Sequence, residues 1–252
     1  MNLRLVILDY PKLMLAQDRV RRIFGDMVIA KQQNFARTSE SYVSMGPLDM
    51  ISTHFLIYNQ NELYHPKIIG AFRCCWGNRT QYHKLRLPIE DYIPYAPIEY
   101  RKEFEKFRVP RPIVVDANAW FVDPDYTFSK TGLKLSEMLY YALVQFIVRK
   151  GFDHWVGATN ERYKASRWAL PTGTTRDGMI FTHPQVQDPH KLLLFETLNY
   201  DWLYDCSKIY FDLMDNRFEF TPSKYPMHEA LLTVGEVLKV IESRRTRLAT
   251  AA

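Results

Sequence analysis

Two charged side chains inside otherwise apolar segments are the first candidates for chemistry in this sequence. Asp116 lies within the apolar residues 113–122, and Arg73 lies within the apolar residues 67–76. Burying a carboxylate without a partner is costly, so Asp116 indicates either an ion pair or a functional role. For Arg73, an ordinary ion pair at the end of a strand is an equally good interpretation. A carboxylate positioned in this way could bind an amine or accept a proton from it.

The segment before a long helical pattern could bind an anion. It reads Ser-Lys-Thr-Gly-Leu-Lys over residues 129–134, and the helical pattern covers residues 133–150. The first N–H groups of a helix lack partners and lie at the positive end of its dipole, so they bind phosphate well. Lys130 and Lys134 would add positive charge. The alternative is that Gly132 only provides a flexible entry to the helix.

The sequence lacks the other common catalytic and metal-binding motifs. Its seven histidines form no HExxH motif, no cysteine pair has zinc-ligand spacing, and neither a P-loop nor GxSxG occurs, so no metal site is expected. A nucleophile at Cys74 or Cys75 is less favoured than a buried strand thiol. With Cys206 as the third cysteine, no disulfide framework is possible, which favours a reducing compartment.

Periodicity and turn residues divide the chain into an α+β order of elements. The order strand, helix, strand over residues 113–159 requires a parallel crossover. We expect one domain over residues 1–200, with a C-terminal helical extension, residues 201–252, packed on it. The predicted strands are residues 53–59, 67–76 (an antiparallel hairpin with the first), 113–122, 152–159 and 191–200, and the predicted helices are residues 14–37 with a break near Gly25 and Asp26, 98–107, 133–150, 160–170, 201–214 and 227–248.

Composition fits an ordinary globular protein with a packed core. Apolar residues make up 47% of the chain and charged residues 24%. The formal net charge of +5 is too small to indicate nucleic-acid binding by itself. The apolar run at residues 5–8 is too short for a signal peptide, and no apolar stretch is long enough to span a membrane. We therefore expect a cytoplasmic protein with no nucleic-acid partner and no membrane span.

Residues 120–173 resemble the core of the GNAT acyltransferase superfamily. They contain a strand ending in Val-Asp-Pro, a loop that opens the long helix, a strand ending near Asn160, and a short helix leading to Gly173. Upstream, residues 70–73 read Gly-Ala-Phe-Arg and match the Gly-x-x-Arg motif of acyl-homoserine-lactone (autoinducer) synthases and related N-acyl amino acid synthases. The resemblance implies a mixed, mostly antiparallel central sheet flanked by helices. In the phosphate loop of the family, only the first glycine, Gly132, is kept.

The resemblance also implies a set of catalytic residues. Phe35 would hold the aromatic place on the first helix, where Gln32 stands instead of the expected arginine. Asp49 would be the acid before the hairpin, and Asp116 the acid of a Glu-x-x-Arg motif whose arginine is missing here. Asp49 and Asp116 are then the candidates for binding the acceptor and taking its proton. Arg73 would orient or stabilise these acids.

Donor-binding residues are implied in the same way. Backbone N–H groups around residues 119–122 would stabilise the negative charge that develops on a thioester oxygen. The loop before the long helix would hold the pyrophosphate of coenzyme A or the phosphate of a phosphopantetheine arm. Tyr163 is a weaker candidate for the acid that protonates the leaving thiolate. The predicted donor-binding residues are Ala119, Phe121, Val122, Lys130, Thr131, Gly132, Leu133 and Lys134.

The implied function is N-acyl transfer related to autoinducer synthesis and quorum sensing. A long acyl chain would move from acyl carrier protein or acyl-CoA to the amine of an amino acid or an amino-acid-derived acceptor. No tightly bound cofactor is expected, because the thioester is a cosubstrate. An acidic carrier protein could meet the basic C-terminal helix, and the abundant aromatic residues could wall an acyl tunnel. The alternatives are a small-amine acetyltransferase that uses acetyl-CoA, and a catalytically silent domain of this fold that binds a ligand or partner.

Overall fold

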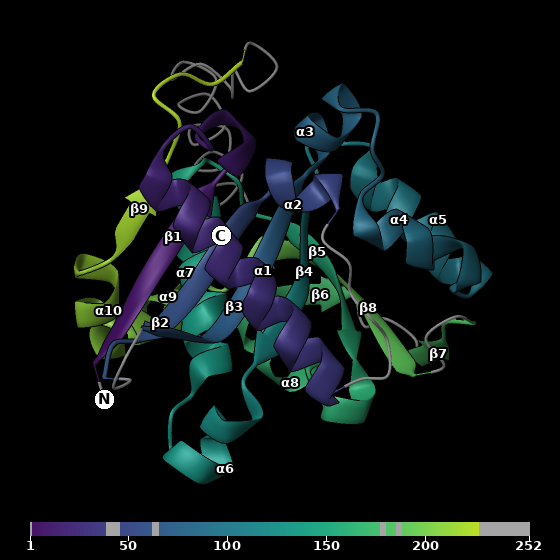
Figure 1. The fold of residues 1–252 in the computed structure, drawn as a ribbon. Coiled ribbons are helices and arrows are strands. Elements are labelled where there is room, and N and C mark those ends of the chain that lie inside the picture. Colours follow the sequence, from purple (N-terminus) through teal and green to yellow (C-terminus); the bar gives the residue numbers. More distant parts are fainter. Residues whose placement is uncertain (1, 39–45, 62–65, 177–179, 185–187, 227–252) are drawn as a thin grey trace.

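A computed structural model describes residues 2–38, 46–61, 66–176, 180–184 and 188–226 of the chain (Figure 1). Its centre is one mixed sheet with the strand order β6-β8-β5-β4-β3-β2-β1-β9, and β7 pairs with β8. Neighbouring strands are antiparallel except in the pairs β4–β5 and β1–β9. The strands are β1 (Leu3–Asp9), β2 (Thr53–Asn59), β3 (Lys67–Trp76), β4 (Val115–Val122), β5 (Trp155–Asn160), β6 (Gly173–Arg176), β7 (Ile180–Thr182), β8 (Pro189–Leu198) and β9 (Phe218–Phe220).

Helices cover both faces of this sheet (Figure 1). The long helix α1 (Asp18–Thr38) crosses one face, and α7 (Leu135–Arg149) lies on the other. The remaining helices are α2 (Pro47–Ile51), α3 (Gly77–Tyr82), α4 (Pro88–Tyr92), α5 (Ile98–Arg108), α6 (Phe128–Thr131), α8 (Ser166–Ala169), α9 (Tyr200–Ile209) and α10 (Phe211–Asp215). No helix in the described ranges is long and apolar enough to cross a membrane.

The central strands are apolar on both sides because both sides are covered. Along β2, Phe55 and Ile57 belong to the core under α7, whereas Leu56 and Tyr58 belong to the core under α1. All seven residues of β2 are buried. A strand packed on two faces reads as a continuous apolar run rather than an alternating one. This arrangement makes any polar side chain in β2 a buried one.

The two faces have separate cores. Under α7, Leu139 and Phe146 pack against strand residues such as Phe72. Under α1, Phe24 and Met27 pack against Leu56 and other residues of β2 and β3. At about 25 cal/mol per Å² of apolar surface removed from water, such cores supply the main stabilisation of the sheet. A polar site between sheet and helix must therefore satisfy its own charges.

The predicted hairpin and parallel crossover are confirmed. Strands β2 and β3 occupy the predicted residues and pair antiparallel, with Thr53 opposite Cys74 and Asn59 opposite Lys67. β4 and β5 are parallel and joined through α7. The expected sheet with flanking helices is therefore the one observed. The predicted helix at residues 227–248 lies outside the described residues.

Several predicted boundaries are wrong. Helix α1 continues through Gly25 without a break, because its apolar face is packed and a helical glycine costs only about 1 kcal/mol. The short helix predicted at residues 160–170 is two 3-10 turns around the four-residue α8. The helix predicted at residues 201–214 is divided at Tyr210 into α9 and α10. The run at residues 5–8, considered only as a leader, is part of β1.

Candidate functional site

Strand β4 carries a bulge in the middle of the sheet. Arg73 pairs with Asn118 and Ala71 pairs with Phe121, so β4 has one residue more than β3 between these pairs. The extra residue lies at Ala119, whose φ is 51°. A positive φ is uncommon for a residue other than glycine and is tolerated where a bulge redirects the strand. The backbone of the predicted donor-binding segment 119–122 is therefore displaced from regular pairing.

Beyond this bulge β4 is not paired with β5. The two strands are joined only at Asp116 opposite Val156 and Ala117 opposite Gly157. Gly157 permits the close approach there, since a Cβ would lie 2.8 Å from the Ala117 carbonyl oxygen. β5 continues its pairing with β8 as far as Asn160. The edge of β4 after Ala117 thus faces a gap in the ladder, as a splayed strand requires.

The amino end of α7 follows β4 in the sequence, after the short helix α6. Gly132 has φ 70° and ends α6, and the Thr131 hydroxyl accepts a hydrogen bond from the Leu133 N–H at 3.2 Å. Lys134 is the N-cap residue and makes no side-chain capping bond. The first bond of the helical ladder is from the Met138 N–H to the Lys134 carbonyl, at 3.0 Å. The earlier N–H groups of the first turn therefore lack helical acceptors.

Charged groups around this helix end are partly paired. Lys130 contacts Asp125 at 3.1 Å, and Lys134 contacts Glu137 at 3.5 Å. Glu137 also accepts a hydrogen bond from the Tyr210 hydroxyl. The segment of residues 130–134 is thus brought together at the helix end, but Glu137 in the first turn opposes an anion there.

A buried ionic cluster forms at the other side of the bulge. Asp49 is fully buried, and its Oδ1 accepts bonds from Lys31 Nζ at 2.8 Å and Arg73 Nη1 at 2.9 Å. Its Oδ2 accepts the Gly46 N–H at 3.1 Å. Burial alone would raise the pKa of Asp49, but the charges of Arg73 and Lys31 outweigh it and lower the pKa to about 2. Asp49 is therefore a permanent anion that fixes two cations.

Asn118 joins Arg73 to Asp116. Its Oδ1 accepts the Arg73 Nε–H at 2.7 Å, and its Nδ2 donates to Asp116 Oδ1 at 3.4 Å. Asp116 Oδ2 accepts the Ile89 N–H at 2.7 Å. Burial raises the pKa of Asp116 to about 7. The hydrogen bonds from the Ile89 N–H and the Asn118 amide lower the pKa but do not outweigh burial. The structure brings Asp49 and Arg73 into contact and connects Asp116 to them through Asn118.

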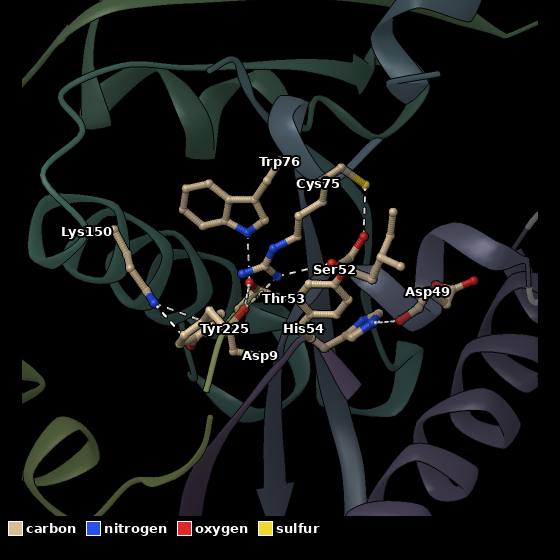
Figure 2. Close-up of polar contacts among 12 residues, drawn as sticks. Asp9, Asp49, Ser52, Thr53, His54, Cys75, Trp76, Lys150 and Tyr225 are labelled. Atoms are coloured by element: carbon tan, nitrogen blue, oxygen red, sulfur yellow. Dashed lines mark hydrogen bonds and ion pairs between the residues drawn. The ribbon is translucent and has the colours of Figure 1, made fainter. Parts of the chain in front are cut away.

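His54 lies beside Arg73 in the next strand. The two residues are directly opposite in the β2–β3 pairing. His54 Nε2 lies 2.7 Å from the backbone carbonyl of Asp49, which can only accept, so this nitrogen carries the proton (Figure 2). Burial lowers the pKa of His54 to about 4, although Asp49 raises it. The imidazole is therefore neutral at pH 7.

A small cavity opens between this cluster and the bulge. Lys31, His54, Arg73 and Ala119 are among its lining residues. Its volume is about 10 Å³, which is room for about one water molecule. The cavity beside Arg73 is therefore not the acyl tunnel that the aromatic-rich strands were expected to wall.

The buried carboxylate of Asp9 belongs to a different cluster (Figure 2). Asp9 Oδ1 accepts bonds from Arg79 at 2.8 Å and Thr53 at 2.5 Å, and Oδ2 accepts the Tyr225 hydroxyl at 2.6 Å. Lys150 Nζ lies 3.5 Å from Oδ2. Burial would raise the pKa of Asp9, but Arg79 and Lys150 lower it to about 2. This set, Asp9 with its four donors, is called the Asp9 cluster below.

Other predicted residues lie outside the ionic cluster. Phe121 packs on the α1 side, with its ring 6.4 Å from that of Phe35. Tyr163 is 44% exposed on a 3-10 turn. Burial raises the pKa of both Cys74 and Cys75, so neither thiol is set up as a nucleophile.

The sequence analysis missed three residues of this site. Lys31, not Gln32, supplies the cation on α1, and its position four residues before Phe35 was the available signal, because such residues share a helix face. His54 and Asn118 gave no signal of their own. Their place in the row His54, Arg73, Asn118 follows only from the strand register.

Comparison with known proteins shows the fold. No family model and no curated protein matches the sequence. The CoA-dependent acyl-homoserine lactone synthase BjaI with SAM and isopentyl-CoA matches at TM-score 0.59 and 8% identity, over 91% of this chain and 98% of that chain. BjaI with MTA matches at TM-score 0.54 and 9% identity, with the same coverage. FeeM, an N-acyl amino acid synthase from uncultured soil microbes, matches at TM-score 0.45 and 17% identity, over 80% of this chain and 93% of that chain. The chain thus has the fold of an acyl-homoserine lactone synthase.

Proposed function

We propose that this protein is an N-acyltransferase that moves an acyl group from a thioester to the amine of an amino acid or a related acceptor. The observation that carries the proposal is the open edge of β4 beyond Ala117. An uncapped helix end follows this strand along the chain, and Arg73 of the buried cationic cluster pairs with the strand at Asn118. The fold shared with BjaI, a CoA-dependent acyl-homoserine lactone synthase, supports the same class of reaction.

The donor thioester would lie along the open edge of β4. The phosphate of acyl-CoA or of an acyl carrier protein would meet the first-turn N–H groups of α7, with Lys130 and Lys134 beside it. Backbone N–H groups near Ala119, released from regular pairing by the bulge, would face the thioester oxygen as it becomes negative. Acyl-CoA is the simpler donor, since BjaI is CoA-dependent.

The acceptor would be held through its carboxylate. Lys31 and Arg73 bring two positive charges to the cavity, whereas Asp49 brings one negative charge. His54 is neutral at pH 7, so the lining keeps a net positive charge. A cation pair with one buried counter-ion favours an anionic group on the ligand. This charge balance supports an amino acid with a free carboxylate as the acceptor.

The reaction then has three steps. The acceptor ammonium loses a proton, and the amine nitrogen attacks the thioester carbonyl carbon. The oxyanion that forms collapses, and the C–S bond breaks. The second proton of the nitrogen passes to the leaving sulfur, so that the products are an amide, a thiol and one proton. Asp49 positions Lys31 and Arg73, and Asp116 supports Arg73 through Asn118.

A product screen tests this proposal. Purified protein is incubated with acyl-CoA and acyl-carrier donors of two to sixteen carbons and with a mixture of amino acids, and thiol release and N-acyl products are measured. We expect products with free amino acids and a higher KM for their methyl esters. Absence of thiol release and amide with every donor would overturn the proposal.

The same screen decides between long and short donors. The cavity beside Arg73 has room for about one water molecule, which favours the alternative of a small-amine acetyltransferase. Products from acetyl-CoA alone would select that alternative. Products from donors of eight or more carbons would select the synthase-like reaction and require an acyl path on another side of β4.

A further inference from the structure

We propose that His54 is the general base of the acyl transfer, taking the proton of the acceptor amine at Nδ1 through one bound water. This inference rests on the proposed function and adds a catalytic residue that the sequence motifs did not indicate. It is carried by the geometry of the cavity, in which His54 is the one neutral nitrogen base among the described lining side chains.

The hydrogen bonding of His54 fixes which nitrogen is available. Nε2 donates to the Asp49 carbonyl at 2.7 Å, so the lone pair of the neutral ring is on Nδ1. Within the described parts of the chain, Nδ1 makes no hydrogen bond. It is also not among the unpaired side-chain atoms that are completely shielded from solvent. A base needs such an accessible lone pair held in a fixed orientation.

The two carboxylates are poorer bases in this position. Asp49 accepts from Lys31, Arg73 and the Gly46 N–H, so both of its oxygens are engaged by charged or backbone donors. Asp116 is not among the residues that line the cavity, and its oxygens accept from Ile89 and Asn118. Neither carboxylate is among the described residues that line the cavity, whereas His54 is.

The strand register places His54 at a workable distance. His54, Arg73 and Asn118 lie opposite one another across β2, β3 and β4, so His54 is two strand spacings, about 10 Å, from the bulged strand. The cavity between them has room for about one water molecule. His54 and Ala119 both line this cavity, so a water in it would relay to Nδ1 the proton of an amine held at the cavity mouth.

The charged groups around the ring act in opposite directions. Lys31 from α1 and Arg73 from β3 disfavour the imidazolium, and Asp49 from α2 favours it. Phe24 from α1 contacts the ring, at 6.2 Å between centroids, and Leu8 is opposite in β1. An acceptor carboxylate bound by Lys31 and Arg73 would offset their charges and make His54 more basic when substrate is present.

Protons and bonds balance in this scheme. Nδ1 receives the first proton of the ammonium, the C–N bond forms, and the C–S bond breaks as the second nitrogen proton passes to sulfur. His54 then releases its proton to solvent and returns to the neutral form. No oxidant, metal or further reactant is required.

The test compares His54→Gln with the wild type across pH. A glutamine amide can keep the donor to the Asp49 carbonyl but has no basic nitrogen. We expect kcat near pH 7 to fall about 100-fold or more, the usual contribution of a general base. The deficit should shrink as pH rises through the pKa of the acceptor amine, because the amine then arrives deprotonated. A purely structural role would give a constant deficit.

His154→Gln is the matched control. His154 is also buried, and its Nε2 donates to a backbone carbonyl, that of Ile113, at 2.9 Å. It lies outside the cavity, so its replacement should not change the shape of the pH profile. An equal pH dependence in the two variants would overturn the inference.

A measurement on the wild type covers the case in which His54→Gln does not fold. Nitrogen-15 NMR of the histidine rings should show His54 protonated at Nε2 and bare at Nδ1 at pH 7. The opposite tautomer would overturn the inference. Wild-type protein without any product overturns the proposed function and this inference together, whereas active wild type with a fully active His54→Gln overturns this inference alone.

Discussion

Among the buried carboxylates in the described part of the chain, Asp9 and Asp49 have similar surroundings, and the roles proposed for them differ. Each has two cationic partners, and the pKa of each is lowered to about 2. In the Asp9 cluster the cations lie against aromatic rings, with Arg79 4.6 Å from the Tyr10 ring centroid and Lys150 4.7 Å from that of Tyr225. Around Asp49 the cations line a cavity instead.

This difference distinguishes the proposed acceptor site from the Asp9 cluster. A buried pair whose partners are all occupied by the protein itself can only hold segments together. Asp9 joins β1 to Thr53, Arg79, Lys150 and Tyr225, which are distant in the sequence. Asp49 with Lys31 and Arg73, called the Asp49 cluster below, has the same charges, but its two cations line a small cavity. Burial and a lowered pKa are common to both clusters, so the proposed acceptor site rests on the cations that line a cavity.

The largest effect should come from the Asp9 cluster. Arg79→Met leaves Asp9 buried without its main cation, so we expect the free energy of unfolding to fall by about 3–5 kcal/mol. Urea denaturation followed by circular dichroism measures this. A loss below about 1 kcal/mol would show that the cluster does not hold the fold.

Arg73→Met should reduce catalysis rather than stability, the reverse of what we expect for Arg79→Met. Lys31 and the Gly46 N–H still neutralise Asp49, so the protein should fold. Loss of a group that orients the acceptor should lower kcat/KM about 100-fold. Steady-state thiol release gives this ratio. Unchanged kcat/KM, with only stability reduced, would make Arg73 a structural residue like Arg79.

Lowering the pH should reduce the contribution of both clusters to the free energy of unfolding. A carboxyl whose pKa is depressed in the folded state stabilises above its unfolded pKa and loses that contribution as pH falls toward 2. The lowering from 3.8 to about 2 corresponds to about 2 kcal/mol for Asp9. The stability difference between wild type and Asp9→Asn should therefore shrink by about that amount between pH 4 and pH 2. A constant difference in urea denaturation would contradict it.

The smallest effect is expected for Tyr225→Phe. This change removes one hydroxyl donor from Asp9 and leaves Arg79, Thr53 and Lys150 in place. The expected loss of stability is about 1 kcal/mol, the net value of one hydrogen bond, with unchanged catalysis. Thermal unfolding and the thiol assay give the two numbers. Impaired catalysis would mean that the Asp9 cluster also serves the reaction.

The sequence predicted what depends on local pattern. Turn residues and apolar runs gave the bounds of β2 and β3, and the strand-helix-strand order gave the parallel pairing of β4 with β5. Asp49 and Arg73 were predicted from motif positions and do lie in contact. Strand β9 was not predictable, because three residues become a strand only through pairing with β1.

What the sequence could not supply depends on register and distance. His54 reads as one polar residue in an apolar strand, and only the pairing with Arg73 shows that it faces the cavity. The Asp9 cluster joins residues more than 200 positions apart, so no local pattern encodes it. The bulge at Ala119 could not be predicted, because the residue with positive φ is an alanine rather than a glycine.

The most direct test of the account measures N-acyl product formed per folded molecule by Arg73→Met and by Tyr225→Phe under identical conditions. If the Asp49 cluster is the acceptor site and the Asp9 cluster is structural, Arg73→Met loses about 100-fold while Tyr225→Phe keeps the wild-type rate. Equal rates in the two variants, or a greater loss in Tyr225→Phe, would contradict the assignment.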